Sequence, residues 1–352
     1  MPSGVDLIVS RDAVTTRFDP QDPTGEATDP LESEVVRYII VAELEDEDRA
    51  RVSSHRRMPR RGMATSSGGS CRNAYDRSCS KRGLFFLSRN RPRSTYNAPM
   101  RTLVVTGSAS GLGAALVRRL EGDGHRVIGL DRHNAQIVTD LGTPDGRVGA
   151  IAGARDACGG TLDGVVSCAG LGPYDDSQAI TRVNYFGAVA ILDGLKQELS
   201  RGTAPAAVAI SSIGAAAEPL MLPEYLQACR DGDEKRAQEI MADKDGTTSY
   251  SNAKRALAEA VKKRAVEWGP LGIRINAVAP GKMETPMLDR LLSDAAHAPA
   301  IEAMPVPLGR HGSADEIAGV VAFLLGPDAS YVQGQVIIAD GGSNALLDPT
   351  RV

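Results

Sequence analysis

The sequence predicts an α/β protein: a doubly wound parallel sheet of about seven strands with helices on both faces, in one domain over residues 100–352. Short apolar runs alternate with helix-like stretches seven times between residues 101 and 343. The runs are apolar throughout instead of alternating with polar residues, which is typical of parallel strands buried on both faces. A chain of 352 residues is long enough to bury such a core.

The first element, residues 102–113, combines an apolar strand with a glycine-rich turn and the start of a helix. Glycines let a backbone approach a bound group closely, and the N–H groups and dipole of a helix N-terminus favour an anion. The spacing Gly-x3-Gly-x-Gly differs from the commoner Gly-x-Gly-x-x-Gly dinucleotide fingerprint, and by itself it is also compatible with a plain tight turn. The candidate anion-binding residues are Gly107, Ser110, Gly111, Leu112 and Gly113.

The second expected strand, residues 125–131, ends in an acid, Asp131. Asp131 stands about twenty residues beyond the glycines, where a carboxylate can accept hydrogen bonds from both hydroxyls of an adenosine ribose. The same carboxylate repels a 2′-phosphate, so the sequence favours NAD over NADP, a preference that the neighbouring Arg132 could soften. The alternative role of Asp131 is that of a turn residue at a strand end.

Three elements follow: a short strand over residues 136–141, a helix around 148–157 and a strand over 163–170. The first ends in Asp140 and Leu141, a polar–apolar pair that can hold an adenine ring or simply form a turn. The last ends in small residues, among them Ala169 and Gly170, where the backbone can approach a cofactor closely.

The remaining elements are a helix over 177–199, strands over 206–212, 273–279 and 335–339, helices over 249–268 and 314–325, and an insert over 213–249. Asn184 falls in the middle of the first of these helices, where asparagine is unfavourable. It therefore either faces solvent or is kept there for a reason. The insert carries Pro219, Pro223 and a charged stretch over 230–236, which is consistent with a helical lid.

Tyr250 and Lys254 lie four residues apart at the start of a helix, so they share one face. A lysine ammonium near a phenol favours the phenolate and is expected to lower the pKa of the tyrosine. Such a tyrosine can take a proton from an alcohol and return it in the reverse direction. By itself the Tyr-x3-Lys pattern is weak, because many exposed helix faces carry it by chance.

The order of these motifs resembles the short-chain dehydrogenase/reductase family over residues 101–343: Thr-Gly-x3-Gly-x-Gly, Asp131, Ser-Cys-Ala-Gly, Asn184, Ser-Ser, Tyr-x3-Lys and Pro-Gly-x3-Thr. The resemblance implies a Rossmann-type fold and a nicotinamide cofactor that accepts or gives hydride. It implies that Tyr250 is the acid/base, that Lys254 tunes it and holds the nicotinamide ribose, and that Ser212 hydrogen-bonds the reacting oxygen. It also implies that Asn184 orders a proton-relay water and that Thr285 contacts the nicotinamide carboxamide.

One motif departs from the family pattern. The family's usual Asn-Asn-Ala-Gly is here Ser167-Cys-Ala-Gly170, which removes two amide side chains from that turn. The small residues Ala169 and Gly170 still allow the backbone to approach a cofactor.

Within that family, the chain resembles the bacterial 3α-hydroxysteroid dehydrogenase/carbonyl reductase subgroup in residues 168–173, 183–187 and 348–350 and in the long insert. In similar enzymes the insert covers the substrate and shapes subunit pairing, which implies a lid over 213–249 and a homodimer. The implied substrate is a small-molecule secondary alcohol or ketone, a 3α-hydroxysteroid above all. Coniferyl-type aromatic alcohol dehydrogenases share the pattern, so an aromatic alcohol is the alternative.

An alternative function, from a class of proteins that are not enzymes, is that of an NAD(H)-binding sensor that uses a basic N-terminal arm to bind nucleic acid. The intact set of Asn184, Ser212, Tyr250 and Lys254 speaks against it, because a sensor does not need the proton-transfer group. Nucleic acid is therefore not the expected partner.

The composition excludes several other classes. No apolar run is long enough for a transmembrane helix, and the N-terminus lacks the basic-then-apolar pattern of a signal peptide. The five cysteines and five histidines show neither disulfide-framework nor metal-ligand spacing. The sequence therefore predicts no metal, no membrane partner and a cytoplasmic location.

Residues 1–99 differ from the rest of the chain. Residues 49–93 contain thirteen Arg or Lys against one acid, Asp76, whereas residues 100–352 contain 24 basic and 30 acidic residues. A stretch so poor in core-forming residues is expected to be a disordered, Arg-rich extension. One explanation is that translation starts at Met100; the alternatives are a genuine arm for nucleic acid or acidic lipid and a transit peptide.

Overall fold

The structure is a computed structural model, and it describes residues 8–11, 14–17 and 99–350. The chain divides into two units, Met1–Arg89 and Asn90–Val352. The described part of the first unit is two short strands, β1 (Ile8–Arg11) and β2 (Val14–Arg17), paired antiparallel. The expected disorder of residues 1–99 falls mostly outside the described residues and stays a prediction.

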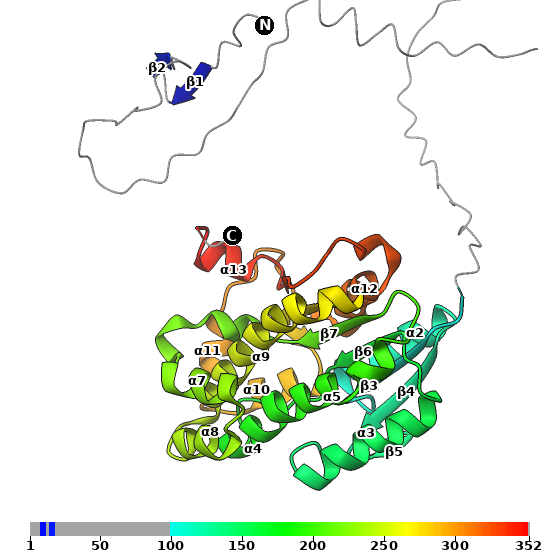
Figure 1. The fold of residues 1–352 in the computed structure, drawn as a ribbon. Helices are drawn as coiled ribbons and strands as arrows, with labels where there is room; N and C mark the ends of the chain where they lie inside the picture. Colours follow the sequence, from blue (N-terminus) through cyan, green and yellow to red (C-terminus); the bar gives the residue numbers. More distant parts are fainter. Residues whose placement is uncertain (1–7, 12–13, 18–98, 351–352) are drawn as a thin grey trace, which may run out of the picture. The chain divides into compact units, whose positions relative to one another are not determined.

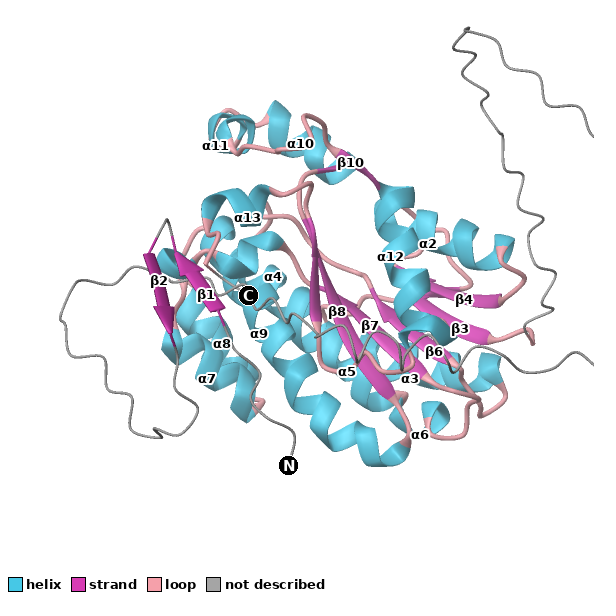
Figure 2. Ribbon diagram, turned by 90° about the horizontal axis from the view of Figure 1, so that it is seen from above, coloured by secondary structure: helices cyan, strands magenta, loops and turns pink. Residues whose placement is uncertain are grey.

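The second unit is built on a seven-stranded sheet whose paired strands are all parallel, in the order β11-β8-β7-β6-β3-β4-β5. Figure 2 shows β8, β7, β6, β3 and β4 side by side in this order. Its strands are β3 (Thr102–Thr106), β4 (Arg126–Asp131), β5 (Ile137–Val138), β6 (Gly164–Ser167), β7 (Ala206–Ile210), β8 (Arg274–Pro280) and β11 (Val336–Ala339). The order changes direction beside β3, so the carboxyl ends of β3 and β6 border a crevice of the kind that binds ligands in such sheets. This arrangement confirms the predicted fold class.

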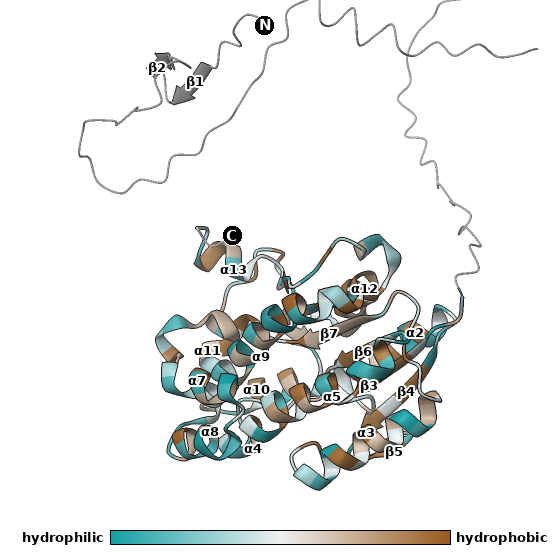
Figure 3. Cartoon of the chain, viewed as in Figure 1, coloured by the Kyte–Doolittle hydropathy of each residue, from teal (hydrophilic) through white to brown (hydrophobic). Residues whose placement is uncertain are grey.

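The sheet separates two hydrophobic cores because alternate strand residues point to opposite faces. Val104 packs into one core, with helices α3 (Pro144–Cys158), α5 (Ala188–Gly194) and α9 (Gly246–Trp268). Leu103 and Val105 pack into the other, with α2 (Gly111–Gly122) and α12 (Ala314–Leu325). Figures 1 and 3 show the helices around the sheet, many of them carrying both hydrophilic and hydrophobic stretches.

The helix expected over 177–199 is interrupted. It consists of α4 (Ser177–Ile180), a π-helix η2 (Thr181–Gly187), α5 and α6 (Lys196–Leu199). The π-helix contains Asn184, so the expectation of one regular helix was wrong at the residue that sequence propensity marks as unfavourable. Likewise the strand expected over 136–141 is only β5, and Asp140 and Leu141 lie in the turn before α3.

The insert after β7 forms two short 3-10 turns, η3 (Ile213–Ala216) and η4 (Glu218–Leu220), and two helices, α7 (Pro223–Asp231) and α8 (Glu234–Met241). The helices pack on each other, on α9 and on η2. Tyr225, which is fully buried in α7, and a hydrogen bond from the Tyr185 hydroxyl to the Cys229 carbonyl (2.8 Å) fix α7 to the main core.

The segment between β8 and β11 holds elements that the sequence did not predict. They are the parallel pair β9 (Met283–Glu284) and β10 (Gly312–Ser313), α10 (Pro286–Ser293) and α11 (Ala298–Ala303). Two 3-10 turns, η5 (Gly269–Leu271) and η6 (Pro327–Ala329), and a last helix, α13 (Ser343–Leu347), complete the fold. Among the helices of the described residues, none is long and apolar enough to cross a membrane.

Candidate active site

The glycine turn between β3 and α2 is packed too tightly for side chains. Gly107 has a φ of +71°, and a Cβ on Gly113 would overlap the carbonyl oxygen of Gly107. Ser110, the N-cap of α2, makes no side-chain capping hydrogen bond. The first N–H groups of α2 therefore face the cavity without a capping side chain, as an anion site requires.

Asp131 lies at the carboxyl end of β4, directly beside this turn. Its carboxylate accepts hydrogen bonds from the backbone N–H groups of Ala109 (3.0 Å) and Arg132 (2.6 Å). These contacts hold the carboxylate against the cavity that the glycine turn also lines. The position fits the predicted ribose-binding role, which stays a prediction.

The turn after β6 is held by one buried hydroxyl. Thr106 Oγ1 accepts hydrogen bonds from the N–H groups of Cys168 and Ala169, both at 3.0 Å. This hydroxyl fixes the turn in which the two family asparagines are missing. Burial raises the pKa of the Cys168 thiol to about 12, so the thiol stays protonated and is a poor nucleophile.

Asn184 is fully buried, and its side chain closes a two-point contact with Leu171. Asn184 Oδ1 accepts from the Leu171 N–H (2.7 Å), and its Nδ2 donates to the Leu171 carbonyl (3.0 Å). A Cβ on Gly170 would lie 3.2 Å from Asn184 Oδ1 and 3.4 Å from Lys254 Nζ. Asn184 therefore does not face solvent; it is buried in the helix, where its amide holds the Leu171 backbone, and it lies close to Lys254.

Tyr250, Lys254 and Ser212 meet where α9 passes the end of β7. The Ser212 hydroxyl lies close enough to the Tyr250 phenol to lower its pKa, and Lys254 Nζ lies 5.7 Å from the centre of the Tyr250 ring. Lys254 is 4% exposed, and its ammonium donates to the Ile210 carbonyl at 2.7 Å. A buried cation thus stands beside a phenol that also lies near a hydroxyl group.

The pKa values differ from the expectation. Burial raises the pKa of Tyr250 above its ordinary value, against the lowering effect of the Ser212 hydroxyl, and burial lowers the pKa of Lys254 to about 8. The prediction that Lys254 lowers the tyrosine pKa was therefore wrong for the protein alone. Desolvation by burial is the largest influence on both groups, and it disfavours the charged form of each.

Most of these groups line one cavity of about 550 Å³. It is lined by the predicted residues Gly107, Ser110, Gly111, Leu112, Gly113, Asp131, Asp140, Leu141, Ala169, Gly170, Ser212, Tyr250, Lys254 and Thr285. Asn184 is the predicted site residue outside this lining; it acts on the cavity through Leu171. Residues at or after the ends of β3, β4, β5, β6, β7 and β8, far apart in sequence, therefore line one cavity.

The far wall of the cavity was not predicted. It comes from α10, α11, the loop after β6 and η4 of the insert, and its side chains are mostly apolar: Leu171, Pro173, Leu220, Met287, Leu288, Leu291, Ile301 and Met304. The ammonium of Lys282 is held by the carbonyls of Ile301 (2.9 Å) and Met304 (2.6 Å). The sequence signal that could have predicted α10 is the amphipathic pattern of residues 286–293, which directly follows Thr285, the N-cap of that helix.

The lid expected over 213–249 lines the cavity through its first turns and Thr247, while α7 and α8 pack elsewhere.

A cation–π contact and an ion pair join α10 to the loop after β6 at this wall. The Arg290 guanidinium lies 3.9 Å from the centre of the Tyr174 ring and 3.5 Å from the Asp175 carboxylate. Asp175 in turn accepts from the Gly172 N–H at 2.8 Å. The two walls that carry Pro173 and Met287 are thereby held together.

The residues present fit a dinucleotide. The glycine turn is a cradle that side chains would fill, the N-terminus of α2 offers N–H groups to a phosphate, and Asp131 stands where a ribose would follow. Within the part of the chain that the structure describes, no group of three or more His, Cys, Asp or Glu side chains could hold a metal ion.

Comparison with known proteins agrees with this geometry. A family model described as enoyl-(acyl carrier protein) reductase matches residues 237–344. The chain is 40% identical over 256 residues to the 3-alpha-hydroxysteroid dehydrogenase/carbonyl reductase of Comamonas testosteroni, covering 72% of this chain and 100% of the relative. It is 29% identical to the coniferyl-alcohol dehydrogenase of Pseudomonas sp. (strain HR199), covering 68% of this chain and 95% of that protein.

Solved structures give the same result. The 3-alpha-hydroxysteroid dehydrogenase from Pseudomonas sp. B-0831, solved with NADH, is 44% identical, with a TM-score of 0.69 over 71% of this chain and 100% of that chain.

Proposed function

Because the chain belongs to the short-chain dehydrogenase/reductase family, we propose that this oxidoreductase uses NAD to interconvert a secondary alcohol and a ketone, with a 3α-hydroxysteroid or a similar bulky carbonyl compound as substrate. The observation that carries the proposal is the convergence of Tyr250, Ser212 and Lys254 on the cavity that the glycine turn lines. The relatives named for hydroxysteroid dehydrogenase activity support the substrate class.

The cofactor would lie along the strand ends. Its phosphates would face the turn from Gly107 to Gly113, its adenosine ribose Asp131, and its adenine Asp140 and Leu141. Its nicotinamide end would lie near Ala169, Gly170 and Thr285. When bound, NAD supplies the hydride acceptor. A carboxylate at residue 131 disfavours the 2′-phosphate of NADP.

Tyr250 is the proposed acid/base. In alcohol oxidation its phenol oxygen takes the hydroxyl proton, and in ketone reduction it returns that proton. The Ser212 hydroxyl, which lies near the phenol, orients the substrate oxygen toward it. The buried Lys254 ammonium stabilises the phenolate that forms, because little water reaches it to screen its charge. In the protein alone this effect is smaller than the opposing effect of burial on the pKa of Tyr250. Asn184 would order a relay water beside the lysine.

The substrate wall favours a large apolar compound. Apart from Lys282, whose ammonium is held by two carbonyls, the side chains of this wall carry no charge. Apolar surface of this kind stabilises a bound hydrocarbon by about 25 cal/mol per Å² buried. A polar sugar would find few hydrogen-bond partners there, so we expect a steroid to bind better than a polyol.

The test is absorbance at the NADH band with the purified full chain. NAD is offered with androsterone and, in parallel, with coniferyl alcohol. Reduction of NAD with the steroid supports the proposal. Reduction with the aromatic alcohol alone would agree with the proposed mechanism but would indicate an aromatic alcohol as substrate, as the name of the coniferyl-alcohol dehydrogenase suggests for that relative. If NADH binds but neither alcohol reacts, the proposed substrate class is wrong. The homodimer and the cytoplasmic location stay predictions.

A further inference from the structure

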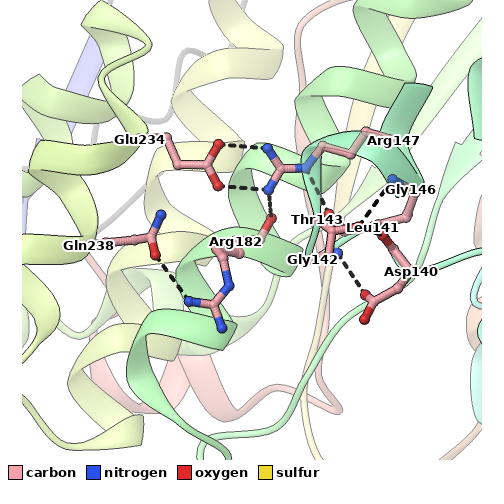
Figure 4. A network of polar contacts seen from close by, with 9 residues as sticks. All are labelled: Asp140, Leu141, Gly142, Thr143, Gly146, Arg147, Arg182, Glu234 and Gln238. Atoms are coloured by element: carbon pink, nitrogen blue, oxygen red, sulfur yellow. Dashed lines mark hydrogen bonds and ion pairs between the residues drawn. The ribbon is translucent and has the colours of Figure 1, made fainter. Parts of the chain in front are cut away.

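Arg147, on the first turn of α3, is the centre of a polar network outside the reacting groups (Figure 4). It is 8% exposed. Its guanidinium meets the Glu234 carboxylate with two parallel hydrogen bonds, Nη1 to Oε2 at 2.6 Å and Nη2 to Oε1 at 2.7 Å. Its Nε donates to the Leu141 carbonyl (2.7 Å) and its Nη2 also to the Arg182 carbonyl (3.0 Å). All three guanidinium nitrogens are therefore engaged.

These contacts join three segments that are far apart in the sequence. Leu141 belongs to the Asp140 loop, which we define as residues 139–143; Arg182 belongs to η2; and Glu234 is the first residue of α8 in the insert. The residues of the Asp140 loop that line the cavity are Thr139, Asp140 and Leu141. The insert adds no charged side chain to the cavity lining. Its helix α8 is nevertheless linked to Leu141, a lining residue, through the Arg147 guanidinium.

The Asp140 loop is held on its other sides as well. Asp140 Oδ1 accepts from the Gly142 N–H (2.8 Å), and Thr139 N donates to the Asp131 carbonyl (2.9 Å). A Cβ on Gly187 of η2 would lie 3.0 Å from Leu141 Cβ, so loop and π-helix are in close contact. The loop is also joined to α3 by a hydrogen bond from Thr139 Oγ1 to the Gly146 carbonyl (2.6 Å), and Thr143 Oγ1 donates to the Asp140 carbonyl (3.1 Å). Arg147 adds the side-chain contact with the Leu141 carbonyl.

Glu234 determines how the guanidinium is oriented. A bidentate arginine–carboxylate pair fixes the plane of the guanidinium as well as its position. Without the carboxylate, Arg147 keeps two carbonyl partners but loses the group that sets this plane and compensates its buried charge. The orientation of Nε toward Leu141 thus depends on α8.

We propose that Arg147 and Glu234 are positioning residues that hold the Asp140 loop in the shape that binds the adenosine half of NAD(H), so that the insert contributes to cofactor affinity. The inference rests on the proposed function, since it requires that the cavity bind NAD(H) with its adenine at this loop. A purely structural pair that only fastens α8 to the core would affect stability without distinguishing one half of the cofactor from the other.

The test compares the full-length wild type with Glu234→Gln, Arg147→Met and Arg147→Lys. The control is Glu239→Gln, the same change on an exposed residue of the same helix, whose partners are Lys235 and Arg236. Dissociation constants are measured for NADH by fluorescence, and for ADP-ribose and reduced nicotinamide mononucleotide by competition. The Tm of each protein without ligand reports on stability.

Glu234→Gln is expected to weaken NADH and ADP-ribose about threefold to tenfold, and Arg147→Met about tenfold or more, with the mononucleotide unchanged. Arg147→Lys should restore little, because an ammonium cannot bind as a fork, and the control should match the wild type. Unchanged affinity for NADH and ADP-ribose in Glu234→Gln, or an equal loss for the mononucleotide, would overturn the inference. Glu234→Gln decides the matter if Arg147→Met does not fold. A wild type that fails to bind NADH would instead contradict the proposed function.

Discussion

Asn184 uses both ends of its side-chain amide on the backbone of one residue, Leu171, accepting from its N–H at 2.7 Å and donating to its carbonyl at 3.0 Å. The π-helix η2 presents Asn184 to this loop, and Gly170 lies between the amide and Lys254. Asn184 therefore sets the backbone that follows β6, where the reacting groups and the cofactor turn meet.

Asn184→Ala should reduce both stability and turnover. The substitution leaves the half-buried Leu171 N–H and carbonyl without their side-chain partners, which costs at most about 1–3 kcal/mol of unfolding free energy per group. We expect a lower denaturant midpoint together with a lower kcat. A variant with a wild-type midpoint and a reduced kcat would assign Asn184 to proton relay alone, and unchanged values of both would contradict its placement.

Tyr250→Phe should lower kcat by a factor of about 10³, because the proton-transfer group is lost. The affinity for NADH should change by no more than about threefold, because the ring and its packing stay. Steady-state rates and an NADH titration of the same preparation check both statements. Substantial remaining turnover would show that another group is the acid/base.

Lys254→Met should stabilise the protein near neutral pH. The pKa of Lys254 is lowered from 10.5 to about 8 by burial, so the charged form is penalised in the folded state. Below pH 8 the penalty is complete. Between pH 8 and 10.5 the unfolded chain binds more protons than the folded one, so wild-type stability rises by up to about 1.4 kcal/mol per pH unit relative to the variant.

Denaturation of both proteins at pH 7, 8 and 9 measures this difference. The advantage of Lys254→Met should be largest at pH 7 and shrink at pH 9. An advantage that grows with pH would mean that the ammonium stabilises the fold. The variant should also lose activity, which would make Lys254 a residue kept at the expense of stability.

Asp131→Asn should change cofactor preference. Asparagine has one acceptor oxygen, so it can keep only one of the two N–H groups that Asp131 accepts, that of Ala109 at Oδ2 or that of Arg132 at Oδ1. It no longer repels a 2′-phosphate. The ratio of kcat/KM for NAD to that for NADP should fall by about tenfold, a change of about 1.4 kcal/mol. An unchanged ratio would assign Asp131 to the turn alone.

Arg290→Ala should loosen the substrate wall. The variant loses the contact with the Tyr174 ring and the ion pair with Asp175. Since Arg290 is largely exposed, we expect only a twofold to fivefold rise in the KM of a bulky alcohol, roughly the worth of an exposed cation–π contact. The KM for NAD should stay constant; a rise in that value as well would indicate a general disturbance of the fold.

The sequence predicted the layout of the sheet well, because apolar runs and glycine turns are local signals. The bounds of α12 match the predicted range, 314–325, and the reacting groups converge as expected from a parallel sheet. The π-helix around Asn184 could not be predicted, since it depends on the tertiary partner Leu171. The raised pKa of Tyr250 likewise depends on burial, which the spacing of Tyr250 and Lys254 does not reveal.

The packing of Gly113 against the Gly107 carbonyl has a consequence for how variation in this protein is interpreted. A library selected only for folding would still retain glycine at 113, because any side chain there must push the preceding turn aside. On the proposed function, the same library would accept phenylalanine at 250, because the ring that packs against the core stays and only the phenol oxygen proposed for proton transfer is lost. Comparing the positions that survive selection for folding with those that survive selection for growth on an alcohol would separate the residues that build the cradle from those that use it.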